Sequence, residues 1–359
     1  MKKFSLLLLL IFAVFQSSTC DAAISEKLLN EAGLQTIWQS SIALNPPDKK
    51  TSKEKVQKIT ILDNYLYILT SNNYLFCLDR NTGRLSFGTI AAAGKLPVFE
   101  PAECNGLTYF IAANNLIIAD VEKGAELHRD KLPFIASAAA AVNSSYRYIP
   151  AADKRLHVID SNSKLEIFTA EADKVSPITS VLADDNSVFF ATQGGNVLCM
   201  TPSQPKKLWQ FDAVDAIMAP LVKVNNWLYV SSKDTNLYKL DAKSGKKIWE
   251  FHTGSALNTP SRATETIVYQ YALNKGLYAI DANSGKQLWL EPDGVELLAQ
   301  NGNIAYTFDK DKTCSVMDNK ESKKIYTINF ADVTNYAANV LDDRIYIMED
   351  KNIYCIGPK

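Results

Sequence analysis

The chain alternates short apolar runs with polar turn residues over nearly its whole length. In residues 219–251, runs of four to six residues rich in Val, Leu and Tyr are separated by Asn225-Asn226, Lys233-Asp234 and Ser244-Gly245. Apolar runs of this length between Asn, Asp, Ser and Gly predict short antiparallel strands joined by tight turns. Four such strands occupy about 40 residues, which leaves no room for an amphipathic helix between them. The one helix predicted is short and covers residues 25–32, before the first strand.

The pattern repeats with a period of about 40 residues. The segment LYKLDAKSGKKIW at 237–249 nearly matches LYAIDANSGKQLW at 277–289. Weaker copies recur along the chain, and they share an anchor position at the end of the third strand of each unit, occupied by Asp79, Asp120, Asp160, Thr201, Asp241, Asp281 and Asp318. A last partial copy at 353–357 ends at its anchor position.

Eight residues after each anchor stands a side chain that carries a ring. These side chains are Phe87, His128, Phe168, Trp209, Trp249, Trp289 and Tyr326. The partial copy has no chain left to supply its ring, but the N-terminal segment offers Trp38. The count predicts an all-β fold: an eight-bladed β-propeller of four-stranded antiparallel blades, with the last blade closed by the N-terminal strand. One propeller domain then covers residues 34–359, after a short lead-in at 21–33.

Both columns have a physical role in such a ring of blades. An Asp at the end of the third strand can accept backbone N–H bonds in the turn that follows, and a Gly four residues later supplies a positive φ. Each ring, His128 included, is expected to pack between neighbouring blades. At about 1.5–3 kcal/mol for each buried ring, eight of them would hold the circle together. We therefore interpret the anchors and rings as structural residues.

The N-terminus has the features of an export signal. Lys2 and Lys3 precede an apolar run of ten residues at 6–15, too short to span a membrane, so residues 1–20 are predicted to be a signal peptide. Two outcomes are open at its end. Cys20 stands where a bacterial lipoprotein carries its lipidated cysteine, whereas cleavage between Cys20 and Ala23 would release a soluble protein. Both outcomes place the protein in the bacterial envelope, as a periplasmic or outer-membrane-associated monomer.

Composition narrows the class of protein further. The 359 residues are 47% hydrophobic, and 38 basic residues nearly balance 39 acidic ones, so the charge gives no reason to expect binding to nucleic acid or to an anionic membrane. Cys77, Cys199 and Cys355 share one column, two residues before the anchor, and are expected to be buried filler. Equivalent points in different blades are too far apart for a disulfide, and Cys104 and Cys314 have no evident partner, so no structural disulfide is predicted.

The repeat resembles that of a known family. The segment Ala279-Ile-Asp281-Ala-Asn-Ser-Gly285-Lys-Gln-Leu-Trp289 is similar to the tryptophan-docking repeat of quinoprotein-type, PQQ-like β-propellers, and the resemblance covers about residues 34–359. The family contains periplasmic dehydrogenases, which bind PQQ with Ca²⁺ near the axis. It also contains non-catalytic scaffolds, typified by the lipoprotein of the outer-membrane β-barrel assembly machinery. Fold resemblance does not choose between them.

The residues favour the scaffold. The dehydrogenases carry adjacent cysteines against the quinone, and this chain has no Cys-Cys pair. His128, His157 and His252 stand in separate blades without metal-ligand spacing. Asp309-Lys-Asp311 begins like a calcium loop, but Cys314 replaces the Gly and Lys320 the Glu that such a loop needs. No catalytic, cofactor-binding or metal-binding residue is therefore predicted.

The sequence thus predicts a non-enzymatic envelope scaffold that mediates protein–protein interaction, with an outer-membrane assembly factor as the implied partner. One alternative is a ligand-binding propeller, such as a PQQ- and Ca²⁺-dependent dehydrogenase that uses the central channel. The other is a surface module that binds a polymer or carbohydrate. An apolar, loop-built patch on one face would favour the scaffold.

Overall fold

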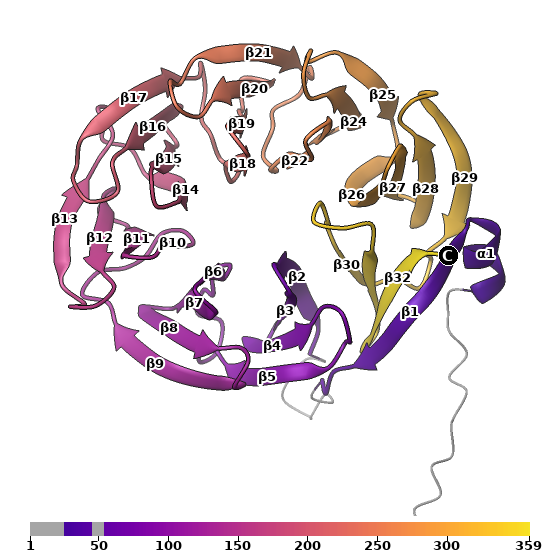
Figure 1. The fold of residues 1–359 in the computed structure, drawn as a ribbon, viewed down its shortest axis with the longest axis horizontal. Coiled ribbons are helices and arrows are strands. Elements are labelled where there is room, and N and C mark those ends of the chain that lie inside the picture. Colours follow the sequence, from indigo (N-terminus) through magenta and orange to yellow (C-terminus); the bar gives the residue numbers. More distant parts are fainter. Residues whose placement is uncertain (1–24, 45–53) are drawn as a thin grey trace, which may run out of the picture.

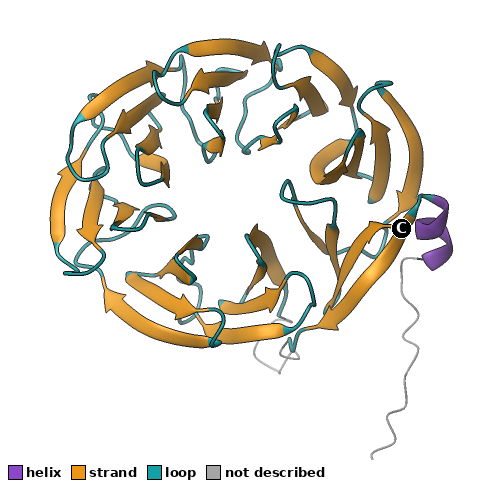
Figure 2. Cartoon of the chain, in the orientation of Figure 1, coloured by secondary structure: helices purple, strands orange, loops and turns teal. Residues whose placement is uncertain are grey.

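The computed structural model describes residues 25–44 and 54–359, so the predicted signal peptide and Cys20 lie outside the described residues. Eight four-stranded antiparallel sheets stand around a central axis like the blades of a propeller (Figures 1 and 2). In each sheet the strands follow one another from the axis outward. The eight-bladed all-β fold predicted from the 40-residue period is confirmed.

The strands of the first four blades are as follows. Blade 1 contains β2 (Val56–Leu62), β3 (Tyr65–Thr70), β4 (Tyr74–Asp79) and β5 (Leu85–Ile90). Blade 2 contains β6 (Ala102–Cys104), β7 (Leu107–Ala112), β8 (Asn115–Asp120) and β9 (Ala125–Lys131). Blade 3 contains β10 (Ala141–Val142), β11 (Tyr146–Pro150), β12 (Leu156–Asp160) and β13 (Glu166–Ala170). Blade 4 contains β14 (Ile178–Ala183), β15 (Val188–Thr192), β16 (Asn196–Met200) and β17 (Lys207–Asp212).

The other four blades complete the circle. Blade 5 contains β18 (Val222–Val224), β19 (Trp227–Ser231), β20 (Asn236–Asp241) and β21 (Lys247–His252). Blade 6 contains β22 (Arg262–Ala263), β23 (Ile267–Ala272), β24 (Gly276–Asp281) and β25 (Gln287–Glu291). Blade 7 contains β26 (Gly294–Asn301), β27 (Ile304–Asp309), β28 (Thr313–Asp318) and β29 (Lys323–Asn329). Blade 8 contains β30 (Asn335–Ala337), β31 (Ile345–Glu349), β32 (Asn352–Pro358) and, as its outermost strand, β1 (Leu34–Ser41).

The ring is closed by the N-terminal strand. β1 pairs antiparallel with β32 from Leu34 opposite Pro358 to Ser41 opposite Asn352. The predicted helix is α1 (Glu26–Glu31), which lies on the outside of blades 7 and 8 (Figure 1). In the other blades a turn joins the third and fourth strands, whereas in blade 8 α1 precedes the fourth strand, β1. The hydroxyl of Tyr326, on β29 of blade 7, donates a hydrogen bond to Glu31 of α1 at 2.9 Å. Closure leaves no blade with a missing strand, which removes an unpaired sheet edge.

The core lies between the blades. Each hydrophobic cluster joins two neighbours; for example, Phe189 and Val197 of blade 4 pack with Leu228 and Leu240 of blade 5. The inward positions of the second and third strands are almost all buried. Stability is thus distributed around the circle, and each seam depends on side chains from both of its blades.

Candidate functional site

The anchor aspartates close the turn between the third and fourth strands. Asp241 Oδ1 accepts hydrogen bonds from Oγ and backbone N of Ser244, both at 2.7 Å, and Asp281 accepts the same two from Ser284. These bonds hold the pKa of both carboxyl groups below the usual range, because they favour the ionised form. In the equivalent turns of other blades, backbone N–H groups donate hydrogen bonds to the anchor carboxylates of Asp79, Asp120, Asp160 and Asp318. In blade 4 the Thr201 hydroxyl instead donates to the Gln204 carbonyl.

Tryptophans of the ring column bridge the seams. Trp209 and Trp249 each donate from Nε1 to a backbone carbonyl in the turn of the next blade, those of Ala242 and Ala282, at 3.0 Å. Trp289 donates to Asn319 Oδ1 at 2.8 Å. The fourth strand of one blade is therefore attached to the anchor turn of its neighbour.

The turn glycines are required for two reasons. Gly245 and Gly285 have φ of +73° and +71°, which L-residues with a side chain rarely adopt. They also lie under the tryptophan of the preceding blade, because a methyl group on Gly245 would stand 2.6 Å from Trp209 and one on Gly285 would stand 2.8 Å from Trp249. The Gly and the Trp of the repeat are thus contact partners across the seam.

The predicted rings differ in burial. Phe87, Trp209, Trp249 and Trp289 are buried, and Trp38, Phe168 and Tyr326 are half-buried. His128 is exposed, so the prediction that its ring packs between blades is wrong. The turn that faces it carries Lys164 at the glycine position, and Lys164 Nζ pairs with Asp130 at 3.2 Å. A glycine is not itself required for docking, since Trp289 is buried against the blade 7 turn, which carries Ser322 at this position. At the turn that faces His128 the longer Lys164 side chain reaches β9, the strand of His128, where it pairs with Asp130.

A second aromatic column escaped the sequence analysis. It occupies the second strand, twelve or eleven residues before the anchor, and contains Tyr67, Tyr109, Tyr148, Phe189, Tyr229, Tyr269, Tyr306 and Tyr346. In each blade this aromatic residue of the second strand pairs with the residue of the third strand that lies two positions before the anchor. That residue pairs on its other side with the docking ring of the fourth strand, so the three side chains form a row across the blade. Tyr229 and Trp249 approach with their ring centroids 6.0 Å apart. An aromatic residue eleven or twelve residues before every anchor was the signal that could have revealed this column.

Three cysteines occupy the middle position of such rows, between the aromatic residue of the second strand and the docking ring of the fourth. Cys77, Cys199 and Cys355 are fully buried between two rings, which confirms their interpretation as filler. Among the described residues, these three together with Cys104 and Cys314 form no disulfide. Lys239 is the exception to the small residues of this column. It is buried, and its Nζ donates to Ala282 O at 2.7 Å and lies 4.1 Å above the Trp227 ring.

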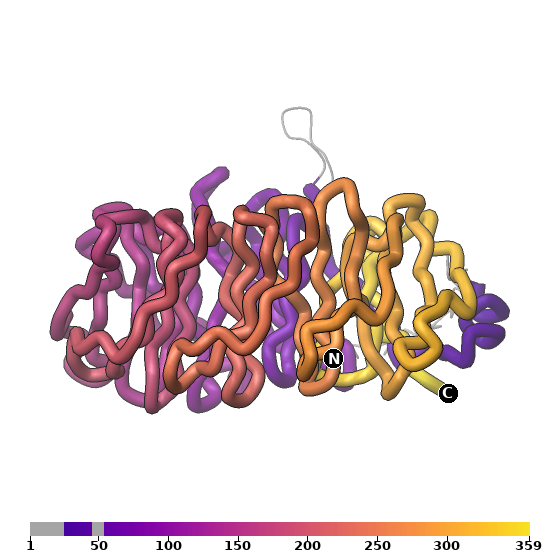
Figure 3. The backbone as a smooth tube through the Cα atoms, turned by 90° about the horizontal axis from the view of Figure 1, so that it is seen from above, coloured from indigo at the N-terminus to yellow at the C-terminus, as the bar shows by residue number. Residues whose placement is uncertain are grey.

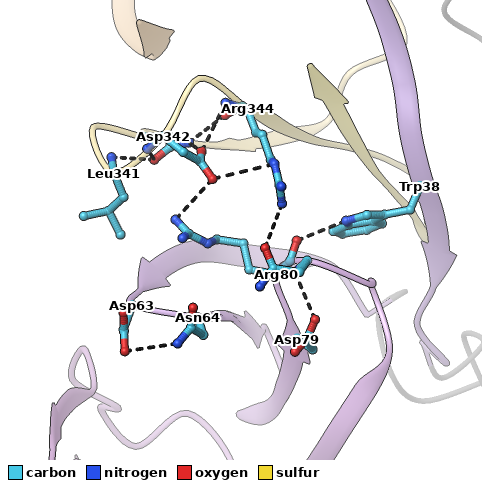
Figure 4. Close-up of polar contacts among 10 residues, drawn as sticks. Trp38, Asp63, Asn64, Asp79, Arg80, Leu341, Asp342 and Arg344 are labelled. Atoms are coloured by element: carbon cyan, nitrogen blue, oxygen red, sulfur yellow. Dashed lines mark hydrogen bonds and ion pairs between the residues drawn. The ribbon is translucent and has the colours of Figure 1, made fainter. Parts of the chain in front are cut away.

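The seam between blades 8 and 1 carries charged groups (Figure 4). Trp38 Nε1 donates to the Arg80 carbonyl at 3.0 Å, and Arg80 Nη1 lies 3.6 Å from the Asp342 carboxylate. Arg344 lies 3.8 Å from the same carboxylate and donates to Asn81 Oδ1 at 2.9 Å. These contacts join the two ends of the chain where the circle closes, so we assign them a structural role.

One carboxyl group near the axis is strongly perturbed. Glu103 of β6 is half-buried between blades 1 and 2 and accepts a hydrogen bond from the Tyr67 hydroxyl at 2.6 Å. Burial raises the pKa of Glu103 from 4.5 to about 7, with a smaller contribution from the charge of Asp63 and an opposing one from the Tyr67 hydrogen bond. The folded protein therefore binds this proton more tightly than the unfolded chain does.

The consequence is a loss of stability as pH rises. The contribution of Glu103 is fully present below the unfolded pKa of about 4.5 and is lost as pH rises through about 7. Glu103→Gln removes this loss and is expected to raise the free energy of unfolding by about 1–3 kcal/mol at about pH 8, with little change at about pH 4. Urea denaturation at both pH values measures it, with Glu100→Gln as the control. Equal effects at the two pH values would contradict the assignment.

The axis itself holds a cavity of about 680 Å³ between the inner strands of blades 1 to 5. Its wall is largely small and apolar, with the alanines at 138–141 on one side and Phe99 and Met218 on others. Two ion pairs lie near the axis. Lys58 pairs with Glu100, and Arg262 binds Glu296 through two contacts of 3.1 and 2.7 Å.

This donor set does not fit a calcium–quinone site. In the parts of the chain that the structure describes, no group of three or more His, Cys, Asp or Glu side chains is placed to hold a metal ion. Arg262, the arginine beside the axis, already has its guanidinium occupied by Glu296. The Asp309–Thr313 segment is the hairpin between β27 and β28, and Asp309 is buried and bound by Thr307 and Ser315.

Seven of the exposed large apolar side chains lie on one side of the disc, and the others lie on the outermost strands or on the opposite side. The connections between blades and the turns between second and third strands lie on the upper side in Figure 3, opposite the C-terminus. We call this side the inter-blade face. Large apolar residues exposed there are Ile90, Leu96, Ile135, Val175, Val214, Met218 and Leu273. Val214 is 91% exposed and Ile135 is 69% exposed, which makes them the two most exposed apolar residues of this face.

The loops that carry these residues are held in place. The Phe134 ring stacks on buried His157 at 3.8 Å, and Ala152 N donates to the Ile135 carbonyl at 2.8 Å. His157 lies between Glu166 and Asp153, at 2.6 and 3.1 Å. Val214 N likewise donates to Asp234 at 3.0 Å. The apolar groups are therefore presented by fixed loops, which lowers the entropic cost of binding.

Comparison with known proteins agrees with this architecture. The crystal structure of BamB from Moraxella catarrhalis matches with a TM-score of 0.65 and 14% identity, over 89% of this chain and 100% of that one. The computationally designed Ika8 protein matches with a TM-score of 0.65 and 16% identity, over 86% and 98% of the two chains. At such identities these likenesses show the fold alone. No curated protein matches the chain.

In the described part of the chain, no helix is long and apolar enough to cross a membrane.

The family model gives the assignment. The model of the family described as outer membrane protein assembly factor BamB matches residues 27–223 and 193–333, which together span seven blades and most of the chain. The chain therefore belongs to this BamB family of PQQ-like repeat β-propellers.

Proposed function

We propose that this protein is a non-enzymatic scaffold of the bacterial envelope that binds a protein of the outer-membrane assembly machinery. The observation that carries the proposal is the set of seven exposed apolar side chains on the inter-blade face, which includes the most exposed one of the described residues, Val214. Exposed apolar groups brought together on one side of a soluble protein mark a protein–protein contact. Family membership supports the choice of partner, because the matching family is described as an assembly factor of outer membrane proteins.

The location follows the N-terminal sequence. A short apolar run behind two lysines is typical of an export signal, and Cys20 follows it directly. The protein is then periplasmic or attached to the outer membrane through a lipid on Cys20, with the propeller as a monomeric disc beside the membrane. In this arrangement the propeller itself needs no membrane-spanning segment.

A pull-down from the envelope tests the function. Ile135→Glu combined with Val214→Glu is expected to reduce recovery of the assembly machinery at least about tenfold, because two desolvated carboxylates would oppose an apolar contact. Components are identified by mass spectrometry. The matched control is Leu165→Glu with Leu208→Glu, two residues of comparable size that are exposed on the outer edge of the disc. Equal losses in both variants, or none in either, would refute the proposal, and Cys20→Ser in the same fractions tests the tether.

The proposal includes the absence of a quinone cofactor. Titration calorimetry of the exported protein with PQQ and excess Ca²⁺ is expected to give no saturable heat, because the axial charges are already paired. A known quinoprotein dehydrogenase stripped of cofactor is the positive control. Saturable binding that is lost in Arg262→Ala would favour a ligand-binding propeller instead.

A further inference from the structure

We propose that the inter-blade face binds an acidic, amphipathic protein segment, one that carries carboxylates beside apolar side chains. The inference rests on the proposed function and specifies the chemistry of the partner. Its basis is a set of lysines that accompanies the exposed apolar residues around blades 2 to 6. We call this set, with its apolar neighbours, the docking arc; its lysines are Lys95, Lys154, Lys174, Lys233 and Lys275.

Each lysine lies next to an apolar member of the arc. Lys95 and Lys174 directly precede Leu96 and Val175 in the inter-blade connections. Lys275 follows Leu273 in the turn between β23 and β24. Apolar and cationic groups therefore alternate around the arc, which is the complement of a segment that alternates apolar and anionic groups.

Two further lysines of the arc lie near an apolar residue that belongs to a different loop. Lys154 stands in the turn that follows β11, and the neighbouring Ala152 binds the Ile135 carbonyl. Lys233 stands in the turn after β19 beside Asp234, which binds Val214 N at 3.0 Å. Contacts between the loops thus bring these lysines to the two most exposed apolar residues of the face.

The lysines are free, whereas the acids of the same loops are engaged. Within residues 54–359, the five lysine side chains of the arc make no hydrogen bond or ion pair. By contrast, Asp173 pairs with Lys207 at 2.8 Å, Asp153 contacts His157 at 3.1 Å, and Asp234 accepts bonds from Val214 N and from the Tyr238 hydroxyl. The loops therefore offer positive charge to a partner and keep their negative charge for internal contacts.

The shape favours a protein segment over a lipid surface. Met218 belongs both to the exposed apolar set and to the wall of the axial cavity, so the arc borders a hollow of about 680 Å³. A protein segment can place a side chain in a hollow, whereas a flat bilayer surface cannot follow it. The sequence as a whole is nearly neutral, at a net charge of −1, so the arc attracts anions through local placement of charge and not through total charge.

The test uses short synthetic peptides of defined charge and the full exported protein. One peptide alternates Leu with Glu, and its matched partner has Lys in place of every Glu. Fluorescence anisotropy is expected to show saturable binding of the acidic peptide alone, weakening as salt rises to about 0.5 M. Reversing the five arc lysines to Glu is expected to lower its affinity at least about tenfold, because several exposed charge pairs act together.

A control on the opposite side of the disc makes the test specific. Lys243, Lys246, Lys286 and Lys320 are exposed in the turns after the third strands, and exposed Lys323 begins β29 beside them; reversal of all five to Glu changes total charge by the same amount. An equal loss of affinity in this control, or equal binding of the basic peptide, would overturn the proposal. So would binding to anionic phosphatidylglycerol vesicles with none to the acidic peptide.

The outcome can be separated from that of the proposed function. If the arc-lysine variant still recovers the assembly machinery from the envelope, while Ile135→Glu with Val214→Glu does not, the scaffold function stands and the acidic partner is refuted. Circular dichroism spectra and denaturation midpoints equal to those of wild type show that each variant is folded.

Discussion

Trp249→Ala is expected to lower the free energy of unfolding by about 3–5 kcal/mol. The Trp249 ring is 9% exposed, packs on Gly285 of the next blade and stands opposite Tyr229 in its own. Its Nε1 also donates to the Ala282 carbonyl, which Lys239 shares. Alanine leaves a cavity at the seam and removes one of two donors to that carbonyl. Guanidinium denaturation followed by far-ultraviolet circular dichroism measures the change.

The neighbouring residue supplies the control. Ile248 precedes Trp249 on β21 but is 42% exposed, so Ile248→Ala is expected to change the free energy of unfolding by less than about 1 kcal/mol. If the two variants unfold at the same denaturant concentration, the tryptophan column does not hold the blades together. The repeat signature would then need another explanation.

A chain that starts at residue 43 is expected to lose its cooperative monomeric fold. The truncation removes β1, leaves the edge of β32 unpaired and takes away the buried side chains of Leu29, Leu34 and Ile42. At about 1.5–3 kcal/mol each, these three alone contribute about 5–9 kcal/mol, which is comparable with the whole stability of a typical domain. Size-exclusion chromatography and binding of a hydrophobic dye are expected to show association and exposed apolar surface.

Complementation distinguishes loss of closure from general damage. A peptide of residues 25–44 added in trans is expected to restore the monomer, because it supplies α1, β1 and their buried side chains together. A chain that starts at residue 25 keeps every one of these contacts and should unfold at the same denaturant concentration as the full chain. A truncated chain that is monomeric, with an unchanged denaturation midpoint, would show that the N-terminal strand does not close the ring.

The errors of the sequence analysis have a common cause. His128 occupies the ring column but is exposed, and the turn it faces carries the long side chain of Lys164, which pairs with Asp130 of the same strand as His128. A docking ring packs against a turn of the next blade, about 35 residues later in the sequence. The spacing of residues within one repeat carries no information about the side chains of that turn. Lys239 shows the same limit. It stands in a column of mostly small residues and is accommodated there by a hydrogen bond that it donates to a carbonyl of blade 6.

The sequence alone determined the number of blades, their four-strand meander and closure by the N-terminal strand. These features follow from local signals, namely short apolar runs, polar turns and a ring eight residues after each anchor, which recur along the chain and need no knowledge of distant contacts. The leftover Trp38 at one end and the missing ring at the other specified the closure.

The tertiary structure decided what the surface and the axis offer. Seven exposed apolar residues share one face because alternate connections of a meander emerge on the same side of the disc, although they lie far apart in the sequence. Arg262 of blade 6 pairs with Glu296 because the fold places blade 7 beside it. The pKa of Glu103 is raised because blades 1 and 2 together bury its carboxyl group. The strength of an electrostatic interaction depends on distance and burial in three dimensions, so neither effect could be found from the nearly neutral composition.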